Sequence, residues 1–173
     1  MHVSLRPWTM DDLGTLVQYA DNKHIADHLA DAFPNPYTRE EGIKFIKRAT
    51  HDKPLKIAAI LADNKVVGSI GIFPDTDIHR KNAAIAYWVA EPFWGKGITP
   101  QAIRLMVIYA FKTFDVHRIY AKPFGDNQSS CRALEKAGFV LEATLKNTIF
   151  KNGKWLDELI YSLRRTDESP SEQ

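Results

Sequence analysis

The sequence is short of cysteine, of long apolar runs and of net charge. Cys131 is the only cysteine among 173 residues, so the chain cannot form an internal disulfide, which is usual in reducing compartments. No stretch reaches the roughly 18 consecutive apolar residues that cross a membrane. The formal net charge is +2 and no Lys/Arg run stands out, which argues against a nucleic-acid surface. We therefore expect a soluble cytoplasmic protein without membrane or nucleic-acid partners.

Composition and length fit a single globular domain. Hydrophobic residues make up 45% and charged residues 25% of the chain, which is ordinary for a protein with a packed core. The six histidines are scattered along the sequence, so no metal site is predicted. We expect one domain over residues 1–165, followed by a polar, disordered tail over residues 166–173.

Hydrophobic periodicity and turn residues predict alternating strands and helices. Strands are predicted over residues 2–6, 57–62, 66–73, 83–90, 118–122, 140–148 and 156–163. Helices are predicted after Thr9, within 22–29, after Thr38, over 100–114 and after Asn127. Helices separate some of the strands but not all of them. The order therefore predicts an α+β fold with a mixed, partly parallel sheet of about seven strands.

The segment from Ala83 to Pro100 has the clearest functional pattern. An uncharged strand, interpreted as apolar on both faces and hence central, leads into Gly95-Lys96-Gly97 and a helix expected to have Thr99 as N-cap and Pro100 as first residue. The free N–H groups of a helix N-terminus bind phosphate, and glycines allow close approach. A simple tight turn is the alternative. The nucleotide P-loop and the dinucleotide fingerprint do not match, since the latter lacks its third glycine.

Several motifs in the same order resemble one known family. Trp94-Gly-Lys-Gly-Ile-Thr99, Asn127-x-x-Ser130 and Leu134-Glu-Lys-Ala-Gly-Phe139 are similar to motifs of the GNAT N-acetyltransferases. Tyr87-Trp-Val89 and Tyr161-Ser-Leu163 resemble the branch that contains ribosomal-protein alanine/serine N-terminal acetyltransferases. The resemblance implies the GNAT fold, with a splayed central strand pair flanked by helices, and acetyl-CoA as co-substrate.

The resemblance also implies which residues bind the cofactor. Pantetheine would pair with backbone at the end of the central strand, and the glycine loop would hold the pyrophosphate. The expected cofactor-binding residues are Val89, Ala90, Trp94, Gly95, Lys96, Gly97, Ile98, Thr99, Asn127 and Ser130.

Three residues of the loop depart from the superfamily pattern. Trp94 stands at the first position of that pattern, Thr99 replaces a small residue, and Pro100 replaces a residue with an N–H group. One missing charge-assisted hydrogen bond predicts weaker CoA binding, by about 1–3 kcal/mol.

The expected chemistry is direct attack of a primary amine on the acetyl carbonyl. Many superfamily members have an acid tyrosine at the place of Leu134, so Ser130 becomes the candidate acid. Glu91, at the end of the central strand, is the candidate base, with Glu142, Asp157 and Glu158 as other carboxylates on the last strands. The alternatives are a plain hydroxyl in a first helical turn for Ser130 and a solvated strand end for Glu91.

The acceptor is the least specified part of the prediction. We expect Phe33, Tyr37 and Trp88 to contact it, although the proline-rich segment around Phe33 could equally be a helix connector. The acceptor is expected to be a protein N-terminus or a small-molecule amine. Two alternatives remain: an amino-sugar or aminoglycoside-like acceptor, and a non-catalytic CoA-binding regulatory module. A homodimer formed through the last strands is also an expectation.

Overall fold

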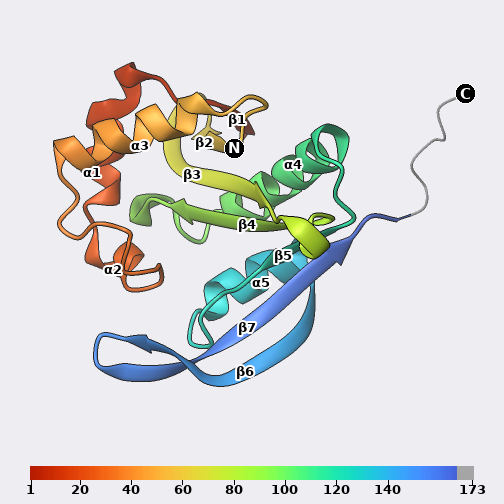
Figure 1. Ribbon diagram of the computed structural model, residues 1–173. Helices are drawn as coiled ribbons and strands as arrows, with labels where there is room; N and C mark the ends of the chain where they lie inside the picture. Colours follow the sequence, from red (N-terminus) through yellow and green to blue (C-terminus); the bar gives the residue numbers. More distant parts are fainter. Residues whose placement is uncertain (167–173) are drawn as a thin grey trace, which may run out of the picture.

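The computed structural model describes residues 1–166 (Figure 1). Its helices are α1 (Leu13–Ala20), α2 (Lys23–Ala26), α3 (Arg39–His51), α4 (Ile98–Thr113) and α5 (Gln128–Lys136). Its strands are β1 (Val3–Pro7), β2 (Ile57–Ala62), β3 (Lys65–Pro74), β4 (Asn82–Val89), β5 (Arg118–Ala121), β6 (Val140–Lys151) and β7 (Lys154–Arg164). The predicted tail, residues 166–173, lies outside the described residues except for Thr166.

The seven strands form one sheet in the order β1-β2-β3-β4-β5-β7-β6. All neighbours are antiparallel except β4 and β5, which are parallel and pair only where Asn82–Ala84 faces Arg118–Tyr120. Beyond these pairs β4 continues to Val89 without a partner on the β5 side. The mixed sheet with a splayed central pair is therefore confirmed.

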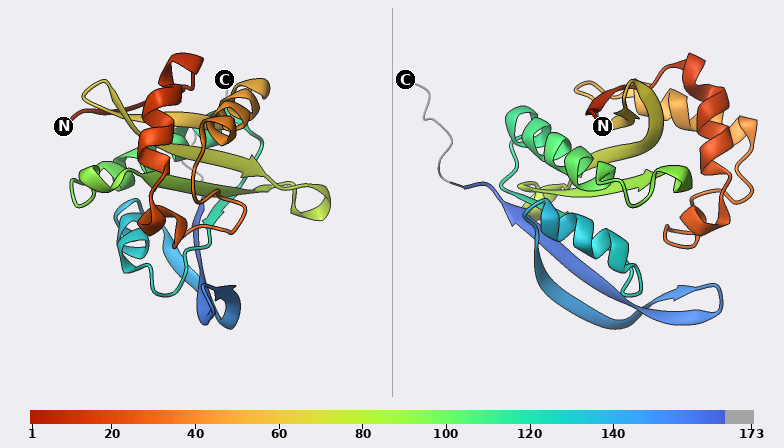
Figure 2. Two further views of the ribbon diagram at one scale, coloured as in Figure 1. Left: turned by 90° about the vertical axis from the view of Figure 1, so that its left-hand side faces the viewer. Right: turned by 180° about the vertical axis from the view of Figure 1, so that it is seen from behind.

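Two hydrophobic clusters cover the two faces of this sheet. One contains Ile103 and Met106 of α4 and Leu134 of α5, and the other contains Leu16 of α1 and Ile46 of α3. Seen from behind, α4 and α5 lie in front of the sheet (Figure 2, right). Each fully buried side chain of this kind contributes about 1.5–3 kcal/mol to folding. The clusters hold the sheet rigid on both sides of the gap between β4 and β5.

The start of α4 differs from the prediction. The helix begins at Ile98, and Gly97 is its N-cap in a left-handed conformation with φ of 72°. Thr99 is therefore inside the helix instead of capping it, and Pro100 is the third helical residue. Glycine adopts this conformation at little cost, so the chain turns into the helix earlier than a threonine cap would require.

Three other local expectations also need correction. Strand β4 is not fully covered on both faces, because Ala86 is exposed and Trp88 is only partly buried where they line the cavity. The second short helix is limited to Lys23–Ala26. The last two strands are longer than predicted and meet in a two-residue turn, Asn152-Gly153, with φ of 51° and 75°. Positive φ at both positions is the requirement of a tight hairpin turn.

The β6–β7 hairpin extends beyond the body of the sheet (Figure 1). β6 is the last strand of the sheet and exposes Val140, Leu141 and Phe150. Exposed edges of this kind can pair with other chains, and the expected homodimer stays a prediction. Within residues 1–166, the helices are all too short or too polar to span a membrane.

Candidate active site

A cavity of about 450 Å³ opens where β4 and β5 separate. It is bordered by the second half of β4, the end of β5, the N-termini of α4 and α5, and the α2 segment. Its lining residues include Tyr87, Val89, Trp94, Gly95, Thr99, Tyr120, Asn127, Ser130, His24 and His28. One cavity thus joins the predicted phosphate loop to the helix that carries Ser130.

The α4 end of the cavity is formed by backbone. Gly95 and Gly97 have φ of 71° and 72°, and no atom lies within 4 Å of where a Cβ would stand on either. The first four N–H positions of a helix lack partners within it, and Pro100 occupies the last of these four. The amides of Gly97, Ile98 and Thr99 are therefore the donors available to an anion.

Two side chains of the loop fold back on the protein. Lys96 places its Nζ 5.3 Å from the centre of the Phe93 ring. Trp94 donates from Nε1 to the carbonyl oxygen of Val89 over 2.6 Å. The indole therefore ties the glycine loop to the end of β4.

The free edge of β4 offers further amides. Ala90 donates its N–H to the Val67 carbonyl on the β3 side over 2.7 Å. Successive residues of an antiparallel strand direct their amides to opposite sides, so those of Val89 and Tyr87 face the gap. Of the two predicted backbone contacts, only the one at Val89 has a free N–H group.

Ser130 and Tyr87 form a hydroxyl pair in the cavity. Their oxygens are 2.7 Å apart, and either can donate. The side chain of Asn127 caps α5 by accepting from the Ser130 amide over 3.2 Å, which fixes the first turn of the helix. Burial raises the pKa of Tyr87, so its phenol stays protonated at neutral pH. Leu134, at the place of the expected tyrosine, is fully buried in the core.

Glu91 lies beside the cavity and does not line it. Its carboxylate accepts from Asn22 Nδ2 over 2.7 Å and lies 3.0 Å from His24 Nδ1. The hydrogen bonds from Asn22 and then His24 lower the pKa of Glu91. A carboxylate that is held ionised in this way is a weak proton acceptor, and its contacts anchor α2 to the end of β4. Its predicted role as base is therefore not favoured by its surroundings.

The three predicted acceptor residues form a packed aromatic group. The Phe33 ring lies 5.4 Å from that of Tyr37 and 6.3 Å from that of Trp88. Tyr37 is buried, which raises its pKa to about 12. Trp88 lines the cavity, whereas Phe33 and Tyr37 support it from behind.

Sequence reasoning missed three residues of the cavity. His24 and His28 stand four residues apart, and both line the cavity. Tyr87 was part of a motif, but the phenol contact to Ser130 spans 43 residues of sequence. The helical spacing of the histidines was the only local signal available.

Comparison with known proteins agrees with this geometry. The sequence profile of the acetyltransferase (GNAT) domain matches residues 2–140. Two Bacillus subtilis relatives are YjcK, 34% identical over 107 residues, and YdaF, 32% identical over 110 residues. They are provisionally named as an N-acetyltransferase and a ribosomal N-acetyltransferase. These matches cover 62% and 64% of the chain, and about 60% of the length of each relative (59% and 60%).

A solved structure matches over nearly the whole chain. RimL, described as a ribosomal L7/L12 alpha-N-protein acetyltransferase in complex with coenzyme A, is 25% identical with a TM-score of 0.81. The match covers 94% of this chain and 93% of RimL. The splayed sheet, with a glycine loop at the mouth of the gap, defines the protein as one with an acyltransferase fold. The chain belongs to the GNAT acetyltransferase family, which confirms the family and the fold expected from its motifs.

Proposed function

We propose that the protein is an acetyl-CoA-dependent N-acetyltransferase that transfers the acetyl group directly to a primary amine. The observation that carries this proposal is the single cavity between β4 and β5. It is lined by Gly95 and Thr99 at the start of α4, by Val89 of β4 and by the Ser130–Tyr87 pair. The N-acetyltransferase names of the relatives and the coenzyme A complex of RimL support the same activity.

The residues present fit coenzyme A. The α4 N-terminus supplies three amides and the positive end of a helix dipole, which suits a pyrophosphate. The gap-facing edge of β4 supplies a strand that a pantetheine amide can pair with. Pro100 removes one donor from this set, so the affinity for CoA is expected to be reduced and not lost.

In the proposed reaction Ser130 protonates the leaving sulfur. Because Tyr87 is buried and protonated, its phenol can donate to Ser130 Oγ while the serine hydroxyl turns to the thiolate. A thiol has a pKa of about 8.5, so a nearby donor assists its departure at neutral pH. The Val89 amide polarises the acetyl carbonyl as the amine attacks. Tyr87 supplies the phenol that the sequence lacks at position 134.

A protein N-terminus is the first acceptor to test. The names of RimL and YdaF, both referring to the ribosome, support it. The cavity is bordered by His24 and His28 on the α2 segment, and that segment is held by the tip of the β6–β7 hairpin through Lys151 and Asn152. No acidic residue stands at Lys146-Asn147-Thr148. A small-molecule amine should therefore be tested beside the peptide.

A thiol-release assay tests the proposal. The panel contains acetyl-CoA with a peptide bearing a free N-terminus, a polyamine and an amino sugar. We expect release with at least one amine, and Ser130→Ala to lower kcat by about 10²-fold, a larger effect than its effect on CoA affinity. Ser130→Thr, which keeps the hydroxyl, is the matched control and should retain most of the rate. CoA binding without thiol release on any amine would indicate a regulatory CoA-binding module instead of an enzyme.

A further inference from the structure

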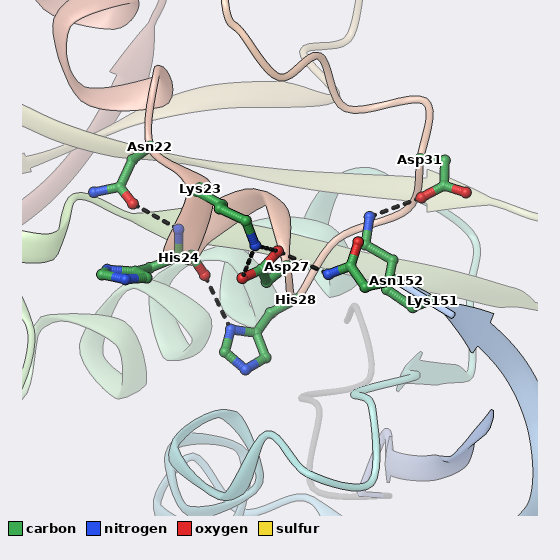
Figure 3. Close-up of polar contacts among 8 residues, drawn as sticks. All are labelled: Asn22, Lys23, His24, Asp27, His28, Asp31, Lys151 and Asn152. Atoms are coloured by element: carbon green, nitrogen blue, oxygen red, sulfur yellow. Dashed lines mark hydrogen bonds and ion pairs between the residues drawn. The ribbon is translucent and has the colours of Figure 1, made fainter. Parts of the chain in front are cut away.

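His28 is a cavity residue with a fixed orientation. It follows α2, its side chain is half-buried, and it lines the cavity together with Ser130 and Tyr87. Its ring nitrogen Nδ1 lies 3.1 Å from the backbone oxygen of His24 (Figure 3). This is the one contact drawn for the His28 ring in Figure 3, and the rest of the ring extends away from α2.

This contact determines the tautomer of His28. A carbonyl oxygen only accepts hydrogen bonds, so Nδ1 must carry the hydrogen. In the neutral ring the lone pair is therefore on Nε2. Nε2 lies on the edge of the ring that is turned away from the α2 backbone. A cavity with a positioned, basic nitrogen is what an amine needs before it can attack an acyl carbon.

The chain on both sides of His28 is anchored to the hairpin tip. Asp27 accepts from Asn152 over 2.9 Å and from Lys23 over 2.8 Å, and Lys151 donates to Asp31 over 2.8 Å. Figure 3 shows these contacts side by side on one flank of α2. The hairpin tip, distant in sequence from α2, thus holds the residues on both sides of His28.

His24 differs from its neighbour in its partner. Its Nδ1 lies 3.0 Å from a carboxylate oxygen of Glu91, whose pKa is lowered by hydrogen bonds from Asn22 and then His24. Its side chain is also 67% exposed. The Nδ1 partner of His28 is a neutral carbonyl, which orients the ring without a full counter-charge. The two histidines therefore differ in what holds the ring: a carboxylate for His24 and a carbonyl oxygen for His28.

The charged and titratable groups around His28 come from several elements. They are Lys23, His24, Asp27, Asp31, Tyr87, Tyr120, Lys122 and Lys151. Both aspartates and Lys151 are engaged in the ion pairs described above. Histidine changes charge between pH 5 and 8 when unperturbed, which is the range where an ammonium needs a base.

Resting on the proposed N-acetyltransferase function, we propose that His28 is the general base that deprotonates the acceptor amine. Nε2 takes one proton from the ammonium, and the nitrogen lone pair then forms the C–N bond to the acetyl carbon. The C–S bond breaks, and the thiolate takes the Ser130 hydroxyl proton. The attacking nitrogen then loses its second proton, which returns to the serine oxygen through the Tyr87–Ser130 pair, and His28 releases its proton to solvent.

His28→Asn tests the proposal. The asparagine amide nitrogen can replace Nδ1 as donor to the His24 carbonyl, so the local structure is kept while the base is removed. We expect kcat to fall by about 10²-fold or more, with CoA affinity unchanged. His24→Asn, on the same segment, should lower kcat by a factor several times smaller. Added imidazole should restore part of the rate of His28→Ala.

The pH profile gives a readout that a structural role would not change. In wild type, kcat should fall on the acid side of the pH profile as an imidazole becomes protonated. His28→Asn should lack this fall and keep only the pH dependence that comes from deprotonation of the amine. Wild-type turnover with an unchanged rate and acid limb in His28→Asn would overturn the inference alone. Absence of turnover by wild type on every amine would overturn the proposed function and the inference with it.

Discussion

The two ends of the cavity are built in different ways. The cofactor end is formed by backbone groups, namely two left-handed glycines, three unpaired amides of α4 and the free edge of β4. At the acceptor end, His24 and His28 line the cavity, and the segment that carries them is held by side chains of the hairpin tip across up to 125 residues of sequence. A backbone site tolerates changes of side chain, whereas a side-chain site changes with each substitution. The same scaffold can therefore keep its cofactor and differ in its acceptor.

Gly97→Val should produce the largest effect on the cofactor end. Valine in the left-handed region costs about 1–2 kcal/mol, and its side chain would fill open space at the donors of α4. We expect CoA to bind at least about tenfold more weakly, measured by titration calorimetry.

Gly153→Val is the matched control for this variant. Gly153 has φ of 75° and no atom within 4 Å of its Cβ position, yet it lies in the hairpin turn. The two variants should lose similar thermal stability, but only Gly97→Val should lose CoA affinity. Equal CoA affinity in the two variants would show that the α4 N-terminus does not bind the pyrophosphate.

The sequence signals for the cofactor end are local. Gly95, Gly97 and the Asn127 cap act within a few residues of themselves, so their spacing carries the geometry. The exact start of α4 was wrong because glycine and threonine compete as caps, and the left-handed Gly97 prevails. Pro100 is compatible with either start, since both leave its missing N–H within the first turn.

The acceptor end was not predictable, because its contacts depend on tertiary structure. Glu91 was expected to work as a base, but Asn22 and His24 reach it across 69 and 67 residues. The Phe33 segment was expected to contact the acceptor, yet Trp88 lies between it and the cavity. No local pattern encodes such pairings, and only the fold brings them together.

Acid should weaken the root of the β6–β7 hairpin. Glu142 on β6 contacts Arg118 of β5 and lies 2.7 Å from Arg164 of β7. These arginines lower the pKa of Glu142 to about 2 from its ordinary 4.5. A lowered carboxyl pKa stabilises the fold above pH 4.5, and this contribution is lost as the pH falls toward 2.

The comparison with Glu142→Gln isolates this effect. At pH 6 wild type should exceed the variant by about 1 kcal/mol in unfolding free energy, since the site is partly exposed. The difference should shrink between pH 4.5 and pH 2, as followed by urea unfolding. A difference that is the same at pH 6 and pH 2.5 would show that the arginines do not hold the carboxylate.

Lys151→Met should give the smallest effect, and one confined to the acceptor. Lys151 is itself well covered, but its partner Asp31 is exposed, and pairs of this kind contribute about 0.2–1 kcal/mol. Losing the contact should raise the acceptor KM by about two- to fivefold, because the segment carrying His28 is then held only at Asp27. Lys146→Met is the matched control, since Lys146 pairs with Asp157 inside the hairpin and does not reach α2. An equal rise of KM in both variants, or a loss of CoA affinity in Lys151→Met, would contradict the division of the cavity into a backbone-built cofactor end and a side-chain-built acceptor end.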